Sequence, residues 1–230
     1  MRSAGDIMND FADRQLDKHI ERTRNRPLTT GRVSPREAIV LAIVLCLLAF
    51  GLVLLLNPLC IELSFVALGL ALIYPYAKRF TMMPQFILGL AYNWGVIMAF
   101  AAVENQLSVL AWVVYGSVVI WTIAHDTFYA MADLPDDIRM GVKSSARLFG
   151  SRCHHAIGIL QAITWILWWS VGQWQGLGAG YDLALLLILP LLVYQHYLAS
   201  GGTITAYIRA FNHNHWVGLL WWLGVVWSMI

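Results

Sequence analysis

The chain has 230 residues, of which 59% are hydrophobic and only 12% are charged. Soluble domains carry about 25% charged residues, so this composition excludes a soluble globular protein and also a disordered chain. The net charge of +2 gives no reason to expect a nucleic-acid partner. What remains is a polytopic membrane protein, because a chain of this length can hold about seven spans of ~20 residues.

Seven apolar stretches of near-spanning length follow one another along the chain. They cover residues 37–56, 59–76, 85–103, 107–128, 154–173, 182–200 and 213–230. We expect α-helices, because a backbone inside lipid must satisfy its own hydrogen bonds and because the stretches lack the alternation of barrel strands. The sequence therefore predicts an all-α membrane helix bundle, surrounded by a lipid bilayer, with residues 1–230 forming one domain.

The fifteen Lys and Arg residues are confined to every second segment between these stretches. Eight precede the first stretch, two lie between the second and third, four between the fourth and fifth, and one between the sixth and seventh. Cytoplasmic loops carry this kind of positive excess. We therefore predict that the N-terminal segment lies in the cytoplasm and that the C-terminus lies outside.

The first of two acidic clusters lies in the N-terminal segment. Asn9, Asp13 and Asp17 are spaced at i, i+4 and i+8, with Asp10 beside them. This spacing predicts one helix face, on which like charges repel one another. A bound cation would relieve the repulsion, and Mg²⁺ commonly takes one or two carboxylates together with substrate phosphates.

The second acidic cluster follows the fourth stretch, on the same predicted side of the membrane. Asp133 and Asp137 are again at i, i+4, and Asp126 and Tyr129 would continue their face towards the membrane. Proline is tolerated in the first turn of a helix but breaks its interior. Because Pro135 lies between the two aspartates, we expect this cluster to straddle a helix start.

Basic residues are interleaved with both clusters. They are Lys18, Arg22, Arg26, Arg139 and Lys143. Carboxylates alone would indicate a cation site, whereas carboxylates with Lys and Arg indicate a Mg²⁺-bound polyphosphate. Within the third stretch, the amide of Asn93 also needs a polar partner inside the membrane.

Three segments resemble one known family. NDFADRQLDKHIERTRNRPLTTG resembles the first aspartate-rich motif of the UbiA superfamily of intramembrane prenyltransferases, and YAMADLPDDIRMGVKSSARLFG resembles its second motif. YPYAKRFTMMPQ resembles the basic loop between them. The likeness covers essentially the whole chain and is strongest to members that prenylate 4-hydroxybenzoate in ubiquinone biosynthesis.

The resemblance implies a helix bundle around a central cavity, in a bacterial inner membrane, with the active site on the cytoplasmic side. Polyprenyl diphosphate and 4-hydroxybenzoate would be the substrates, and 3-polyprenyl-4-hydroxybenzoate and diphosphate the products. The implied Mg²⁺ ligands are Asn9, Asp10, Asp13, Asp17, Asp133 and Asp137. The implied substrate-binding residues are Asn9, Lys18, Arg22, Arg26, Lys78, Arg79, Tyr129, Arg139 and Lys143.

Catalytic roles are expected for Asp13, Asp17, Asp133, Asp137, Arg79 and Asp126. Arg79 occupies the position of the family arginine thought to pair with the carboxylate of the acceptor. Asp126 is one candidate to take the ring proton. The family usually has nine spans, with the first motif after the second span, so the segment MRSAGDIM is expected to end that span and the chain to lack most of the first two helices.

Three alternatives remain open at this point. The first is the same chemistry on another acceptor, such as homogentisate, a naphthoate or haem. The second is a cation transporter, which predicts acids near the bilayer midplane rather than at one interface. The third is a CDP-alcohol phosphotransferase, whose glycine- and alanine-interleaved aspartate motif does not occur in this sequence.

Overall fold

The computed structural model describes residues 2–229, which form α-helices and short 3₁₀ turns with no strand in that range. This confirms the all-α fold class. The longer helices are α1 (Arg2–Asp13), α2 (Pro35–Val53), α3 (Pro58–Ile73), α5 (Pro84–Glu104), α6 (Val109–Met140), α8 (Cys153–Gln175), α9 (Gly178–Ala199), α10 (Ile204–Asn212) and α11 (Asn214–Trp227). The short elements are α4 (Ala77–Phe80), α7 (Ser145–Phe149) and the 3₁₀ turns η1 (Asp17–His19), η2 (Tyr74–Tyr76) and η3 (Gly150–Arg152).

Local capping residues set several helix ends. Ser34 and Glu37 form a reciprocal capping box at the start of α2, and Asn57 caps α3 by accepting a hydrogen bond from the backbone of Cys60. Gly141 ends α6 in the left-handed region with φ 69°, where a residue without a Cβ is favoured. These polar ends separate helices whose interiors are almost wholly apolar.

Six helical segments within residues 2–229 are long and apolar enough to cross a membrane, and they correspond to the first six predicted stretches. The seventh predicted stretch contains α11, which has 14 residues and directly follows α10. A straight span needs ~20 residues, so the seventh span stays a prediction. Residue 230, at the end of that stretch, lies outside the described residues.

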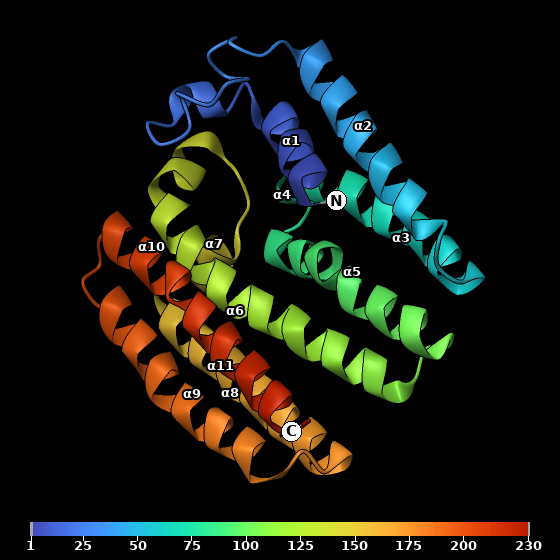
Figure 1. The fold of residues 1–230 in the computed structure, drawn as a ribbon. Helices are drawn as coiled ribbons and strands as arrows, with labels where there is room; N and C mark the ends of the chain where they lie inside the picture. The colour runs from blue at the N-terminus through green and yellow to red at the C-terminus, as the bar shows by residue number, and fades with distance from the viewer. Residues whose placement is uncertain (1, 230) are drawn as a thin grey trace.

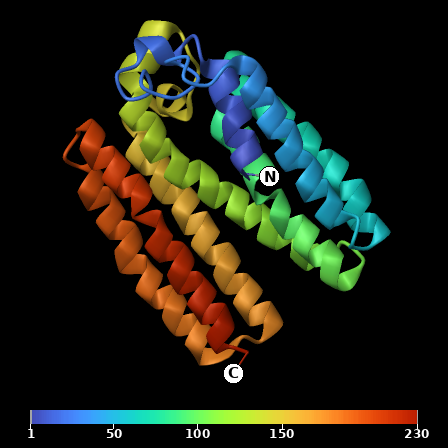
Figure 2. The same cartoon turned by 45° about the horizontal axis from the view of Figure 1, so that its top comes forward.

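The 32-residue helix α6 divides the molecule into two groups of helices. Helices α1, α2, α3 and α5 lie on one side of it, and α8, α9, α10 and α11 on the other (Figure 1). Helix α6 packs directly on α5, α8 and α10. In the turned view of Figure 2, the segment that joins α1 to α2 lies beside the end of α6, at the opposite end of the molecule from the C-terminus. The two acidic motifs are therefore brought to the same end of the bundle.

Large apolar side chains cover much of the outer surface. Leu55 is 80% exposed, Val193 70% and Trp227 71%. Inside the second group of helices, the rings of Trp168 and Trp221 stack with their centroids 4.7 Å apart. An apolar exterior over a packed aromatic interior is what a bundle in lipid requires, because lipid tails take the place of water around it.

Two local expectations are wrong. Pro135 does not interrupt α6, which continues through it to Met140, so the second motif does not straddle a helix start. The first motif is not one helix, because α1 ends at Asp13 and Asp17 begins the separate turn η1. Proline removes only one backbone hydrogen bond, and neighbouring packing can outweigh that loss.

Candidate active site

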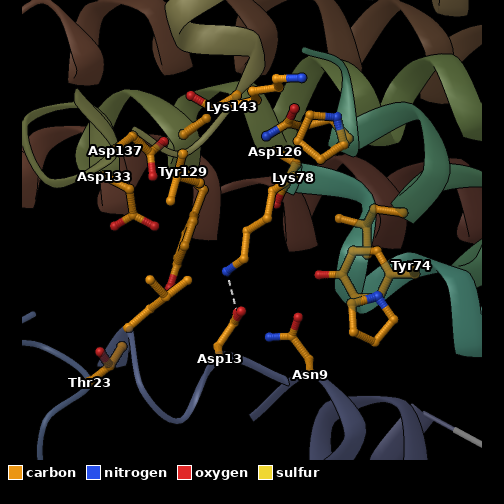
Figure 3. Close-up of a pocket in the computed structure, with 18 of the residues that line it drawn as sticks. Asn9, Asp13, Thr23, Tyr74, Lys78, Asp126, Tyr129, Asp133, Asp137 and Lys143 are labelled. Atoms are coloured by element: carbon orange, nitrogen blue, oxygen red, sulfur yellow. Dashed lines mark hydrogen bonds and ion pairs between the residues drawn. The ribbon is translucent and has the colours of Figure 1, made fainter. Parts of the chain in front are cut away.

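A cavity of about 530 Å³ lies at the end of the bundle where the two motifs meet. It is lined from α1, the segment joining α1 to α2, η2, α4, α5, α6, the α6–α7 connection and α10. In Figure 3, Asp133 and Asp137 lie on one side of the cavity, Asn9 and Asp13 on another, and Lys78 extends towards Asp13. The predicted site residues that line it are Asn9, Asp13, Asp17, Arg22, Arg26, Lys78, Asp126, Tyr129, Asp133, Asp137 and Lys143.

The first motif is held together by an arginine that follows it in sequence. Arg26 Nη1 donates to Asp10 Oδ1 at 2.7 Å and to Asp17 Oδ2 at 3.1 Å. Asp17 is buried, and Asp10 is half-buried. Burial raises the pKa of the Asp10 carboxyl above its ordinary value, while the Arg26 guanidinium opposes that rise. The single helix face expected from the spacing is thus replaced by a helix and a turn that share one cation.

Asp13 is paired across the cavity with Lys78 of α4, whose ammonium donates to Asp13 Oδ2. Asp13 is only 3% exposed, and its Oδ1 has no hydrogen-bond partner among residues 2–229. Burial raises the pKa of the Asp13 carboxyl, and Lys78 offsets part of that rise. A buried carboxylate oxygen without a partner is unusual and marks a place where a ligand or cation can bind.

Arg22 joins the N-terminal segment to the second motif. Its Nη2 donates to both carboxylate oxygens of Asp133, at 2.7 and 3.0 Å, and its Nη1 donates to the hydroxyl of Tyr129. The guanidinium also lies 4.7 Å from the centroid of the Tyr129 ring. Burial lowers the pKa of Arg22, but Asp133 and Tyr129 outweigh burial and raise it. Arg22 therefore holds the N-terminal segment against α6 along one wall of the cavity.

Further along α6, away from the motifs, the cavity wall is lined mainly by neutral polar and aromatic groups. Asn93 of α5 satisfies its amide nitrogen by donating to the carbonyl of Gly89 at 2.9 Å and to Thr122 Oγ1 at 2.8 Å. Asp126 and Phe211 also line this part. Asn93 thus has the polar partner that its place in a span demanded.

Four of the predicted site residues lie outside the lining of this cavity. Arg79 donates to the backbone carbonyl of Ala12 at 3.0 Å and lines a neighbouring pocket of about 560 Å³, which shares Lys78 with the cavity. Arg139 donates to the carbonyl of His19 at 2.6 Å. Asp10 is paired with Arg26, and Lys18 is exposed to solvent.

Several lining residues were missed by the sequence reasoning. Tyr74, Gln85, His125 and Ser144 all contribute to the cavity. A signal existed for His125, which is a polar side chain within an apolar stretch and directly precedes Asp126. The other three lie inside segments that resemble family motifs, Tyr74 and Gln85 in YPYAKRFTMMPQ and Ser144 in the second motif, so their place in those segments was the signal.

The residues present fit a hard divalent cation in part. The polar groups of both motifs are carboxylates and an amide, which are oxygen donors, and Asp13 Oδ1 is unpartnered. No group of three or more His, Cys, Asp or Glu side chains within residues 2–229 is close enough to complete a metal site. Mg²⁺ commonly combines one or two carboxylates with phosphate oxygens of a substrate.

Fold and site together define an integral membrane protein with a cavity that is lined by two acidic motifs and by cations. A profile of the UbiA prenyltransferase family matches residues 1–227. The chain belongs to the UbiA prenyltransferase family.

Two curated relatives are similar over almost the entire chain. A 4-hydroxybenzoate octaprenyltransferase of Saccharophagus degradans is 48% identical over 226 residues, which is 98% of this chain and 76% of the relative. Another, from Hydrogenovibrio crunogenus, is 46% identical over 98% of this chain and 79% of its own length.

Solved structures show the same fold. A UbiA homolog from Aeropyrum pernix K1, in its apo form, superposes with a TM-score of 0.86 and 29% identity, covering 100% of this chain and 86% of that chain. A UbiA homolog from Archaeoglobus fulgidus, bound to DMAPP and Mg²⁺, gives a TM-score of 0.69 at 19% identity, over 99% and 83%. The second likeness is evidence for the fold alone.

Proposed function

We propose that this chain transfers a polyprenyl group from polyprenyl diphosphate to the ring of 4-hydroxybenzoate, in ubiquinone biosynthesis. The observation that carries the proposal is the meeting of two aspartate motifs and their cations in one cavity of a membrane bundle. The acceptor is supported by relatives 46–48% identical that are named 4-hydroxybenzoate octaprenyltransferases. We further propose that residues 1–230 act as a single prenyltransferase domain.

Diphosphate binding would use the cations that now neutralise the motifs. Arg22, Arg26 and Lys78 each pair with an aspartate in the cavity. Diphosphate oxygens bind guanidinium groups more strongly than a single carboxylate oxygen does, so the substrate can displace the aspartates from these cations. Lys143, and more remotely Lys18 and Arg139, would add positive charge to the same end of the bundle.

The aspartates of both motifs, together with the amide oxygen of Asn9, would hold Mg²⁺ against the diphosphate. The proposed ligands are Asn9, Asp10, Asp13, Asp17, Asp133 and Asp137. When bound, Mg²⁺ neutralises negative charge on the departing diphosphate. The A. fulgidus homolog is itself bound to DMAPP and Mg²⁺.

The chemistry is an electrophilic substitution on a phenol ring. Cleavage of the bond between the prenyl carbon and the diphosphate oxygen leaves an allylic cation, which Tyr129 and the apolar walls shield from water. The electron-rich carbon beside the phenol hydroxyl attacks the cation, and a new carbon–carbon bond forms. The proton on that ring carbon then passes to the carboxylate of Asp126, which lines the cavity.

Arg79 is proposed to recognise the carboxylate of the acceptor. Its pocket shares Lys78 with the cavity, so a carboxylate paired with Arg79 would lie next to the proposed diphosphate site. A bacterial inner membrane with the cavity at the cytoplasmic face is the proposed location, supported by the positively charged segments at the cavity end.

The test is a transfer assay in membranes that contain the full chain. Octaprenyl diphosphate would be supplied with 4-hydroxybenzoate, homogentisate or a hydroxynaphthoate, and products would be identified by mass spectrometry. We expect 3-prenyl-4-hydroxybenzoate, abolished by EDTA and restored by Mg²⁺. Transfer to another acceptor but not to 4-hydroxybenzoate would refute the proposed acceptor.

Variants test the placement of the site. Asp13→Ala and Asp133→Ala should each abolish transfer. The matched control is Asp182→Ala, because Asp182 is bonded to Gln173 where α8 and α9 meet, far along the chain from both motifs and outside the cavity lining. Full activity in both motif variants would refute the assignment of the metal and diphosphate ligands.

A further inference from the structure

His125 is held in one tautomer by the backbone. Its Nδ1 lies 2.9 Å from the carbonyl oxygen of Trp121, one helical turn earlier. A carbonyl oxygen can only accept a hydrogen bond, so Nδ1 must carry the hydrogen. In the neutral ring Nε2 is then an acceptor with a free lone pair.

The plane of the His125 ring is fixed by aromatic neighbours from two helices. The ring of Trp121 lies 5.3 Å away between centroids, and that of Phe211 in α10 lies 5.6 Å away. His125 lines the cavity, and no hydrogen bond to its Nε2 comes from residues 2–229. The imidazole is therefore oriented in advance, with its one unsatisfied atom available to a molecule in the cavity.

The depth of His125 suits an acceptor that meets the prenyl group below the diphosphate. His125 precedes Asp133 by eight residues on the uninterrupted helix α6, which corresponds to about 12 Å along the axis. A diphosphate beside Asp133, followed by the first prenyl carbon and then a phenol ring, occupies a length of this order. Asp126 lies at nearly the same depth, but adjacent residues on a helix point about 100° apart, so the two side chains reach different atoms of one ring.

We propose that His125 Nε2 is the base that takes the proton of the acceptor's phenol hydroxyl, an inference that rests on the proposed function. As the oxygen–hydrogen bond breaks, its electron pair moves into the ring and enriches the carbon beside the oxygen. That carbon then bonds to the allylic cation, which formed when the diphosphate left with the electron pair of the carbon–oxygen bond. After Asp126 takes the proton from the ring carbon, the imidazolium returns its proton to the phenolate oxygen. The net proton released resides on Asp126.

Chemical rescue tests this role. In the purified full chain, transfer from geranyl diphosphate to 4-hydroxybenzoate would be measured for His125→Ala and His125→Phe, with and without added imidazole. We expect each variant to lose about 100-fold or more in kcat, the usual contribution of a general base. Imidazole should restore at least about tenfold in the alanine variant, where it can enter the vacated space, and nothing in the phenylalanine variant, where the ring blocks it.

A second acceptor distinguishes a base from a packing residue. The phenol of 3-fluoro-4-hydroxybenzoate is more acidic and needs less help to ionise, so the loss in His125→Phe should be smaller with it. The matched control is His215→Ala, because His215 makes the same Nδ1 contact to a carbonyl, that of Asn212 at 2.6 Å, but is exposed outside the cavity. This variant should keep full activity.

The outcomes separate the two proposals. A wild-type chain that does not prenylate 4-hydroxybenzoate refutes the proposed function. Wild-type activity together with an unimpaired His125→Ala, or with an equal loss for both acceptors in His125→Phe, overturns the role of His125 alone. Because phenylalanine preserves the contacts to Trp121 and Phe211, this variant should fold, which size-exclusion chromatography in detergent checks.

Discussion

Replacing Gly224 by alanine should push α11 away from α9. A Cβ at position 224 would lie 2.6 Å from the Cβ of Ala184, and the normal contact begins at 3.4 Å. Neither group can rotate away, because both are single methyl groups attached to helix backbone. The helices must therefore separate by several tenths of an ångström, which stretches the 2.9 Å hydrogen bond from Trp221 Nε1 to the hydroxyl of Tyr181.

The expected cost can be worked out from this contact. Overpacking of a tight interior costs about 1–3 kcal/mol, and replacing a helical glycine by alanine returns about 1 kcal/mol. The net loss in the free energy of unfolding is therefore about 0–2 kcal/mol. In a chain of ~230 residues, a loss of this size lowers Tm by up to roughly 8 °C.

Thermal unfolding in one detergent, followed by tryptophan fluorescence, measures this change. Gly69→Ala is the matched control, because no atom lies within 4 Å of a Cβ at that position of α3. Its Tm should equal or exceed that of the wild type. The double variant Gly224→Ala with Ala184→Gly removes the opposing methyl and should recover most of the loss. If Gly224→Ala melts no lower than Gly69→Ala, the close approach of α9 and α11 is not a constraint and the reasoning fails.

Two further predictions concern polar contacts. Arg22→Lys should speed amide hydrogen exchange in residues 17–30, because an ammonium cannot donate to both oxygens of Asp133 as the guanidinium does. The free energy of unfolding should change by less than ~1 kcal/mol, because the ion pair is partly exposed. Unchanged exchange would contradict the role of Arg22 in holding this segment against α6. Gln161→Leu should lower the free energy of unfolding by about 1–3 kcal/mol, because it leaves two buried or half-buried polar atoms without a partner. In the wild type, Gln161 Nε2 donates to Gln195 Oε1 at 2.8 Å, and Gln161 Oε1 lies 3.0 Å from His196 Nε2. Adding Gln195→Leu should return part of this loss in thermal unfolding, and a further equal drop would argue against a shared network.

The class of protein and the composition of the site could be read from the sequence because they depend on local patterns. The length of the apolar stretches matches the thickness of the hydrocarbon core of a bilayer. The distribution of Lys and Arg indicates which helix ends lie on the same side of the membrane. The chemistry of carboxylates beside cations likewise follows from residue types alone. Asn93 illustrates the same point, since an amide in a span must find a partner whatever the fold.

The arrangement of the site could not be read in this way. The i, i+4, i+8 spacing is compatible with one helix, whereas in the structure the helix stops at Asp13 and Asp17 is buried against Arg26. Pro135 would end an isolated helix, whereas the packing of α6 on its neighbours keeps it continuous.

What the sequence determined by itself was a membrane helix bundle with two acidic motifs and their cations at one end, because spacing and charge sorting are properties of short segments. What only the tertiary structure decided was which partner each side chain has. Arg22 reaches Asp133 across 111 residues of chain, Arg79 turns to the end of α1 instead of the cavity, and His125 acquires a fixed tautomer in contact with α10. Such pairings depend on how α6 is packed between the two groups of helices, and no local pattern contains that information.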